Sequence, residues 1–427
     1  MADQSNLSVV VIGTGYVGLP AALLLARAGH QVVGVDINEN VVRALNQGIL
    51  HIKEADLQQL MEDPTVRRNL TAQTTPCPAD VFLIAVPSPL DQLKKIAELN
   101  YVRQAAFSIV PHLRPGNLVI LESTVPPLTC RTCVTPILEQ SGLKVGVDLF
   151  LAHCPERILP GDVFEEIIHN DRVIGAADQV SRDFAYRVYA SFVQGELFQT
   201  DDVTAELCKL MENTYRDVNI ALANEFAALA EDLHIDALEA ISLANRHPRV
   251  NILKPGIGVG GHCIPIDPWF IKEVSPANSR LIFTSRLVND EMPDKIAAKI
   301  RRAVRGVREP KIVAVGAAYK PNIEDIRESP ALKIVNLLRE DGYHVDHLDP
   351  LVPGMQYTTL SEPCRDADCL AVLVEHDVVR DEIRTRGDLI RRTMRTPTVL
   401  RFFTEDKTGT RVTPATSPSS DITEMAV

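Results

Sequence analysis

The sequence lacks the long apolar runs that membrane proteins need. No stretch of about 18 consecutive apolar residues occurs in it, so we expect no membrane-spanning helix. No basic segment precedes the first apolar run, and Gly13 and Gly15 interrupt that run, so we expect no cleaved signal sequence. Cysteine is also sparse, with eight residues in a chain of 427. Without an export signal, these cysteines are expected to be reduced thiols of a cytoplasmic protein.

Positive charge is in deficit as well. The chain has 44 lysines and arginines against 56 aspartates and glutamates, which gives a net charge of −12. A nucleic-acid surface needs clustered cations to neutralise phosphates, so this balance argues against one. The one basic cluster, between Arg380 and Arg401, is interleaved with acidic residues, which is typical of a solvated, ion-paired face.

The order of apolar runs indicates the fold class. From Leu7 onward, short apolar runs alternate with helix-length amphipathic segments, and this alternation is typical of a doubly wound parallel sheet. We therefore expect an α/β domain over residues 1–200. Its strands are predicted at Leu7–Ile12, Gln31–Val35, Val81–Val86, Leu118–Leu121, Leu149–Ala152, Arg172–Ile174 and Glu196–Gln199.

A long segment without glycine or proline follows Asp202 and extends to Leu233, which predicts one long helix. This helix opens a helical central domain over residues 201–306. A second Rossmann-like α/β domain is predicted over residues 307–403, from strand patterns at Lys311–Val315, Tyr343–Leu348, Cys369–Val374 and Thr398–Leu400. Residues 404–427 have few apolar side chains and predict a disordered tail.

A glycine-rich turn closes the first predicted strand. Gly13, Gly15 and Gly18 form the pattern G-x-G-x-x-G where a strand should meet a helix. The first glycine permits a tight turn, the second lets the backbone approach a diphosphate, and the third lets the helix pack on the strand. Asp36 ends the next predicted strand, where a carboxylate binds ribose hydroxyls and repels a 2′-phosphate. NAD is therefore favoured over NADP, with an ordinary glycine turn as the alternative.

One cysteine stands in a setting unlike the others. Cys263 lies in the glycine-rich segment Gly258–Asp267, where the backbone offers a ligand close access and a thiol can serve as a nucleophile. A buried, inert thiol is the alternative interpretation. Cys130 and Cys133 form a single C-x-x-C with no second pair, so we expect no metal site.

On the long predicted helix, Lys209 and Asn213 share a face because they are one turn apart. An ammonium and a carboxamide directed at one point suit a developing alkoxide or a tetrahedral oxyanion. A solvent-exposed lysine beside an unrelated asparagine is the alternative.

Several motifs together give the chain a close resemblance to the nucleotide-sugar 6-dehydrogenases, over about residues 7–375. They are Gly13–Pro20, Glu122–Pro126, Cys154–Arg157, Lys209–Asn213, Gly258–Asp267 and Tyr319–Asn322. The resemblance implies a four-electron oxidation of a UDP-sugar to its uronic acid by two equivalents of NAD, through a thiohemiacetal and a thioester. It also implies a homodimer built around the long helix.

The resemblance assigns roles residue by residue. Cys263 would be the nucleophile, and Lys209 would donate and accept protons. Around the reacting carbon and the attacking water would lie Asn213, Asp267, Thr124 and Glu156. The residues that would contact NAD are Gly13, Gly15, Tyr16, Val17, Gly18, Asp36, Ser88, Thr124 and Arg327. The residues that would hold the UDP-sugar are Arg157, Ile158, Lys209, Asn213, Arg216, His247, Arg249, Gly260, Tyr319 and Lys320.

Departures from the family pattern bear on the sugar. UDP-glucose dehydrogenases commonly have serine before the nucleophile and lysine just before the aspartate, where this chain has His262 and Ile266. These two departures argue against glucose as the preferred sugar. The segments Arg246–Ile252, Gly260–Cys263 and Asp267–Phe270 most resemble family members that act on UDP-N-acetyl-D-mannosamine. This resemblance implies that UDP-N-acetyl-D-mannosamine is preferred over UDP-N-acetyl-D-glucosamine and well ahead of UDP-glucose. The family often carries an Asp-x-Arg element after the last strand; this chain has Thr398–Phe403 there, so no contact is assigned to it.

Two other functions remain open from the residues alone. A two-electron hydroxyacid dehydrogenase also combines a dinucleotide domain with a long helix bearing lysine and asparagine, but it leaves Cys263 and the third domain unexplained. An NAD-responsive binding protein without turnover has no need for a nucleophile, a base and oxyanion donors.

Overall fold

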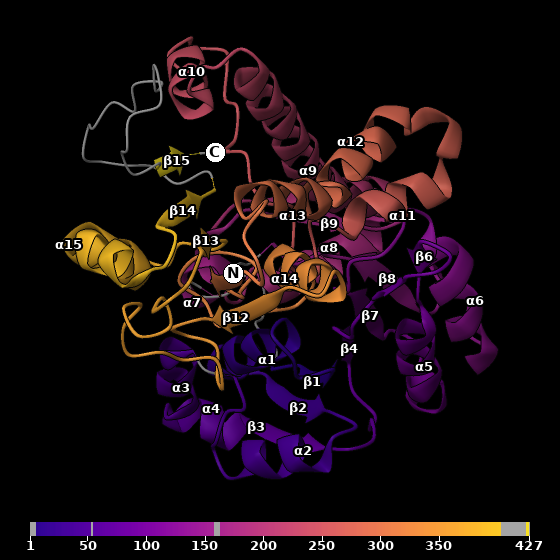
Figure 1. Ribbon diagram of the computed structural model, residues 1–427. Helices are drawn as coiled ribbons and strands as arrows, with labels where there is room; N and C mark the ends of the chain where they lie inside the picture. The colour runs from indigo at the N-terminus through magenta and orange to yellow at the C-terminus, as the bar shows by residue number, and fades with distance from the viewer. Residues whose placement is uncertain (1–5, 53, 158–162, 403–423, 427) are drawn as a thin grey trace. The chain divides into compact units, whose positions relative to one another are not determined.

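The computed structural model describes residues 6–52, 54–157, 163–402 and 424–426 (Figure 1). The chain forms two compact units, of which the first comprises Met1–Glu212 with Trp269–Asn278 and the second Asn213–Pro268 with Ser279–Val427. The division falls within two helices, α9 (Asp202–Asp232) and α11 (Asp267–Val274). Among the described residues, no helix is long and apolar enough to span a membrane.

The first unit contains an eight-stranded sheet in the order β10-β9-β8-β7-β4-β1-β2-β3. Neighbouring strands are parallel except β8 and β9, which pair antiparallel. The strands are β1 (Ser8–Ile12), β2 (Gln31–Val35), β3 (Leu70–Gln73), β4 (Val81–Ile84), β7 (Leu118–Leu121), β8 (Phe150–His153), β9 (Arg172–Gly175) and β10 (Leu197–Thr200). A small hairpin joins β5 (Leu90–Asp91) to β6 (Ile96–Ala97).

Side chains alternate between the two faces of this sheet. Along β1, Val9 and Val11 belong to one buried cluster, whereas Val10 and Ile12 belong to another. Helices cover both faces, so successive residues of the central strands are apolar. The first cluster includes residues of α1 (Gly18–Arg27), α3 (Ala55–Met61), α4 (Pro64–Asn69), α7 (Val163–His169) and α8 (Gln179–Tyr189). The second includes α5 (Asn100–Ile109) and α6 (Thr135–Leu138). Helix α2 (Glu39–Asn46) follows β2.

The second unit contains a parallel five-stranded sheet in the order β12-β11-β13-β14-β15. The strands are β11 (Lys311–Val315), β12 (His344–Leu348), β13 (Cys369–Val372), β14 (Thr398–Arg401) and β15 (Glu424–Ala426). Ile312 and Ala314 pack with α13 and α14, while Val313 and Val315 face the cluster that includes α15. The helices after α9 and α11 are α10 (Ala237–Ala244), α12 (Arg280–Asp290), α13 (Met292–Ala303), α14 (Pro330–Glu340) and α15 (Asp377–Thr393). The predicted α/β fold class is confirmed.

Two C-terminal features can be compared with what the sequence predicts. Helix α15 carries much of the basic cluster, and ion pairs join Arg384 to Asp381 and Arg391 to Asp388, as expected of a solvated face. Most of the predicted tail, residues 404–423 and 427, lies outside the described residues, so its disorder stays a prediction. Residues 424–426 form β15, which pairs with β14.

Candidate active site

The predicted dinucleotide and water-activating residues of the first unit follow strand ends at one edge of the first sheet, whereas Arg327, also predicted to contact NAD, belongs to the second unit. Strands β8, β7, β4, β1 and β2 are neighbours and run parallel, so their carboxyl ends meet there. The residues that follow these ends are Glu156, Thr124, Ser88, Gly13–Gly18 and Asp36, in that order. In open α/β sheets, ligands bind in the crevice at this edge.

The three glycines of the turn differ in what surrounds them. Gly13 has a φ of +89°, and a Cβ atom there would lie 2.6 Å from the carbonyl oxygen of Ala85. A Cβ atom on Gly18 would lie 2.0 Å from the carbonyl oxygen of Gly13. A Cβ atom on Gly15 would meet nothing within 4 Å. The protein itself therefore needs glycine at the first and third positions, and the open backbone at Gly15 fits the approach of a diphosphate.

Asp36 is fastened to this turn. One carboxylate oxygen accepts hydrogen bonds from the Thr14 amide, at 3.2 Å, and from the Thr14 hydroxyl, at 2.9 Å. The other oxygen accepts from the Asn38 amide at 3.0 Å. The carboxylate is thus oriented beside the glycine turn, where the ribose of a dinucleotide would lie.

Replacing Asp36 by alanine is expected to weaken NAD binding by about tenfold or more, the scale of hydrogen bonds to a charged group. The same change removes the charge that repels a 2′-phosphate, so NADP should become a usable cofactor. Steady-state kinetics with each cofactor measures both effects. Glu39→Ala removes the same charge from an exposed position nearby and serves as the control. An unchanged preference for NAD in Asp36→Ala would remove Asp36 from the site.

A buried polar network fixes Glu156. One of its carboxylate oxygens accepts a hydrogen bond from the Arg172 guanidinium at 2.7 Å, and the other accepts from the Arg157 amide at 2.7 Å. The Arg172 guanidinium also lies over the ring of Tyr189, 5.2 Å from its centroid. The hydroxyl of Tyr189 donates to Glu122 at 2.6 Å. Glu156 therefore has a fixed orientation and a cationic partner.

Two carboxyl groups of this network hold different charges. Burial, together with the nearby Glu156 carboxylate, raises the pKa of Glu122 to about 8. At neutral pH Glu122 thus keeps its proton, while Glu156 forms the ion pair with Arg172. No role in the site was predicted for Arg172 or Tyr189 from the sequence. The available signal was an arginine at the start of an otherwise apolar predicted strand.

The other predicted residues of the first unit lie in varied settings. The Ser88 hydroxyl donates to the carbonyl oxygen of Thr124, so these two residues are brought together. Arg157 forms an ion pair with Glu212 of α9 at 2.7 Å, and Lys209 is half-buried on the same helix. Tyr16 is exposed, and Val17 is half-buried at the start of α1. Ile158 lies outside the described residues.

In the second unit, Cys263 is exposed on a tight turn. The amides of Ile266 and Asp267 both donate to its carbonyl oxygen, at 3.0 and 2.9 Å, and α11 begins at that point. The side-chain amide of Asn213 donates to Asp267 at 2.6 Å, and both residues are buried. Asn213 and Asp267, both expected beside the reacting carbon, are therefore in direct contact near the thiol turn, and their roles there stay predictions.

The imidazole of His262 lies beside the thiol, with Nδ1 at 3.6 Å from Cys263 Sγ. Burial lowers the pKa of His262, and the positive charge of Arg327 lowers it further. His262 is therefore neutral at neutral pH and places no fixed cation beside the thiol.

The glycines before the thiol are required by Tyr319. A Cβ atom on Gly260 would lie 2.6 Å from the Cβ of Tyr319. Gly261 has a φ of +81° and donates its amide proton to the carbonyl oxygen of Arg327 at 3.0 Å. The thiol loop therefore packs directly on the segment from Tyr319 to Arg327. Burial raises the pKa of Tyr319, so its hydroxyl stays protonated and able to donate a hydrogen bond.

The remaining predicted substrate residues lie nearer the surface. His247 and Arg249 are exposed on a loop that Asn245 closes through two hydrogen bonds to Ile252. Arg216 is exposed on α9, and Lys320 is half-buried after Tyr319. Contact of these four side chains with a substrate stays a prediction.

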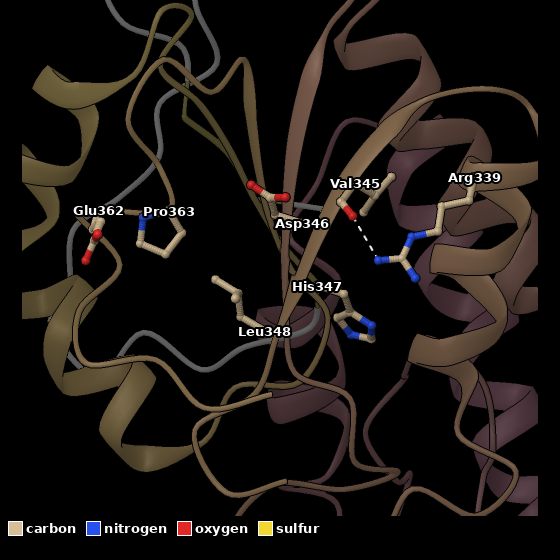
Figure 2. Close-up of a pocket in the computed structure, with 7 residues that line it drawn as sticks. All are labelled: Arg339, Val345, Asp346, His347, Leu348, Glu362 and Pro363. Carbon is tan, nitrogen blue, oxygen red and sulfur yellow. Dashed lines mark hydrogen bonds between the residues drawn. The ribbon is translucent and has the colours of Figure 1, made fainter. Parts of the chain in front are cut away.

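A separate pocket of about 410 Å³ opens beside the outer strand β12 (Figure 2). Arg339 borders it and donates to the carbonyl oxygen of Val345 at 2.9 Å. Its lining comprises Arg339, Val345, Asp346, His347, Leu348, Glu362 and Pro363. These residues include none of those predicted to bind cofactor or substrate, so we do not assign the active site to this pocket.

Comparison with known families finds three matches in chain order. The NAD binding domain of the UDP-glucose/GDP-mannose dehydrogenase family matches residues 7–193. The central domain of that family matches residues 203–291, and its UDP binding domain matches residues 313–402.

Individual relatives are similar to this protein over most of the chain. The chain is 44% identical over 385 residues to the UDP-N-acetyl-D-mannosamine dehydrogenase of Methanococcus maripaludis, covering 88% of each protein. It is 42% identical over 395 residues to the NDP-N-acetyl-D-galactosaminuronic acid dehydrogenase of Ralstonia nicotianae, covering 88% of this chain and 93% of the relative. The solved structure of a UDP-D-ManNAc dehydrogenase from Pyrococcus horikoshii is similar with a TM-score of 0.87 and 37% identity, covering 92% and 94% of the two chains.

Proposed function

Because this chain belongs to the UDP-glucose/GDP-mannose dehydrogenase family, and is therefore an NAD-dependent dehydrogenase, we propose that it oxidises UDP-N-acetyl-D-mannosamine to UDP-N-acetyl-D-mannosaminuronate. The observation that carries the proposal is the near full-length similarity to proteins named for this activity, from two different organisms. The exposed thiol of Cys263 on its glycine loop supports the four-electron course.

The thiol explains how an alcohol can reach the level of an acid. Bound NAD supplies a hydride acceptor for each of the two oxidations. In the first, Lys209 takes the proton of the C6 hydroxyl as the aldehyde forms. The Cys263 thiol then adds to the aldehyde carbon, and its proton passes to the aldehyde oxygen to give a thiohemiacetal. A second hydride leaves to a second molecule of NAD and the hydroxyl proton leaves to solvent, which forms a thioester. Covalent attachment keeps the aldehyde in the site between the two oxidations.

Other side chains would stabilise charge and deliver water. Asn213 uses one amide proton on Asp267, which leaves its second N–H for the oxyanion of each tetrahedral stage. Glu156 would accept a proton from the water that cleaves the thioester, with Thr124 helping to orient that water. The ion pair with Arg172 suits this role because it holds the Glu156 carboxylate in a fixed orientation.

The test is NADH production from UDP-N-acetyl-D-mannosamine, the N-acetylglucosamine and N-acetylgalactosamine epimers, and UDP-glucose. We expect two NADH per sugar and the highest kcat/KM for UDP-N-acetyl-D-mannosamine. UDP-glucose should be slower by about 100-fold or more, because a site that pairs the acetamide leaves its own polar groups unsatisfied when a simple hydroxyl sugar binds. One NADH per sugar would favour a two-electron dehydrogenase. An equal or higher kcat/KM for UDP-glucose would make the sugar assignment wrong.

We also propose that the protein is a homodimer formed through α9. Apolar side chains lie exposed along this helix at three- to seven-residue spacings, which is one stripe of a helix surface. They are Met211, Tyr215, Leu222, Phe226 and Leu229. A stripe of this length on the surface of one chain is typical of an interface between symmetric copies.

Light scattering at micromolar concentration should give a mass close to twice that of one chain. Phe226→Glu places a charge in the stripe and should shift the mass toward that of a single chain. Leu281→Glu alters an exposed leucine on α12 and should leave the mass unchanged. A single-chain mass for the unmodified protein would contradict the proposal.

A further inference from the structure

We propose that His376 is a positioning residue. Together with Asp349 it holds, through hydrogen bonds, the backbone on both sides of the Tyr319–Lys320 dipeptide, and it thereby sets the affinity for the UDP-sugar. The inference rests on the proposed function, which assigns Tyr319 and Lys320 to the substrate. It adds two residues that lie outside the family motifs in the sequence.

Asp349 and His376 meet across the carboxyl end of strand β11. Strand β11 lies between β12 and β13, and the segment Gly316–Lys320 leaves its carboxyl end. Asp349 follows β12, and His376 precedes α15 in the connection from β13. The His376 Nε2 donates to Asp349 at 2.9 Å, and both side chains are completely buried. The bond therefore joins the two strands on either side of β11 at the point where the dipeptide's segment begins.

Asp349 holds the upstream flank. Its carboxylate accepts from the amides of Ala317, at 2.7 Å, and Ala318, at 3.3 Å, the two residues directly before Tyr319. Its second oxygen accepts from the amides of Leu351 and Val352. Although burial opposes the charged form, hydrogen bonds from His376 and the backbone hold the pKa of Asp349 far below its ordinary value. The group is therefore a permanent carboxylate, and its bond to His376 is charge-assisted.

His376 holds the downstream flank. The amide of Asn322 donates to His376 Nδ1 at 2.9 Å, so Nδ1 is the acceptor and the ring proton is on Nε2. Asn322 has a φ of +63°, in the left-handed region, and its side chain accepts from the Asp377 amide at the start of α15. Pro321 is the only residue between this anchor and Lys320, and its ring fixes the φ angle there.

The dipeptide between these anchors has little freedom left. The Tyr319 amide donates to the carbonyl oxygen of Asp325 at 3.0 Å, and the side chain packs against Gly260 and Gly261. Loss of either anchor would thus displace Lys320 and disturb the packing of the thiol loop. The glycine turn and Asp36 belong to the first unit, and Arg327, the predicted NAD contact of the second unit, is held by its own ion pair with Asp325, so NAD binding gives a control.

Two substitutions separate the two bonds of the imidazole. In His376→Gln the amide nitrogen reaches the Nε2 position and keeps the bond to Asp349, but the acceptor for Asn322 is lost. In His376→Asn the amide oxygen takes the Nδ1 position and keeps that acceptor, but the bond to Asp349 is lost. We expect the KM for UDP-N-acetyl-D-mannosamine to rise about tenfold in His376→Gln, the scale of one buried hydrogen bond, and less in His376→Asn. The Kd for NAD should stay unchanged in both.

If His376 and Asp349 only stabilised the fold, the measurements would give a different result. The melting temperature of both variants would fall and KM would stay within twofold of the unmodified value, which would overturn the proposal. If His376→Gln fails to fold, Asp349→Asn provides the same test. Its amide opposes the Nε2 proton, favours the other tautomer and so removes the acceptor for Asn322. His344→Gln, at an exposed histidine of β12, is the matched control and should change none of these quantities.

Calorimetry with UDP alone separates this proposal from the proposed function. UDP should bind the unmodified protein and bind His376→Gln about tenfold more weakly, whichever sugar the enzyme oxidises. Failure to oxidise UDP-N-acetyl-D-mannosamine with this difference in UDP affinity intact would refute the proposed function alone. Equal UDP affinity in the two proteins would refute the role of His376 alone.

Discussion

Replacing Cys263 by serine is expected to reduce formation of the uronic acid by about three orders of magnitude or more, the scale on which loss of a nucleophile acts. Serine is a far weaker nucleophile at neutral pH because its hydroxyl does not ionise there. The turn around residue 263 is held by backbone bonds to Ile266 and Asp267, so the loop should keep its shape. NAD should bind Cys263→Ser as tightly as it binds the unmodified protein.

Product formation and NAD binding, measured on the same preparation, distinguish lost chemistry from lost folding. Cys77→Ser alters a cysteine in the loop between β3 and β4 and should retain full activity. Alkylation of Cys263 offers a second route to the same question. Full turnover by protein whose Cys263 is completely alkylated would refute the covalent mechanism.

Replacing Arg172 by methionine is expected to lower the free energy of unfolding by about 3–5 kcal/mol, the usual cost of removing one partner of a buried ion pair. Arg172 is 2% exposed, and its guanidinium is the cation of a network that contains the carboxyl groups of Glu156 and Glu122. Methionine fills similar space but leaves the Glu156 carboxylate buried without its counter-charge. Urea denaturation monitored by fluorescence measures the loss.

A double substitution shows whether the cost comes from Glu156. Glu156→Gln removes the buried charge, so adding it to Arg172→Met should recover part of the lost stability. Arg187→Met, at an exposed arginine of α8 that stacks on Phe184, should change stability by no more than about 0.5 kcal/mol. A loss below about 1 kcal/mol in Arg172→Met would contradict a charged, unsolvated network.

Local sequence patterns were sufficient to predict much of the fold. The runs Gln31–Val35 and Lys311–Val315 form strands with those bounds because both faces of each sheet are covered and every position after the first is apolar or small. Strand β3 escaped prediction because Leu70–Gln73 alternates only two small or apolar residues with polar ones. Its place is set by pairing with β2, which no local pattern reveals.

The candidate site also contains residues that local sequence patterns could predict and residues that they could not. The glycine turn and Asp36 could be predicted because their chemistry lies within one β-α-β unit of sequence. The glycines at Cys263 were noticed, but their cause, the contact with Tyr319, joins segments far apart in the chain. Arg172 and His376 were missed because a buried charge or imidazole gains its partners only when strands from different parts of the chain become neighbours.

The outer strand β12 has a consequence for how the molecule behaves at high concentration. An edge strand presents backbone amides and carbonyls that can pair with an edge of another sheet and begin aggregation. Here the strand carries His344 and Asp346, and Asp346 forms an ion pair with Lys311 at 3.3 Å. Bringing another strand against this edge would strip water from these polar groups. The charged edge thus acts as a barrier to sheet extension and protects solubility.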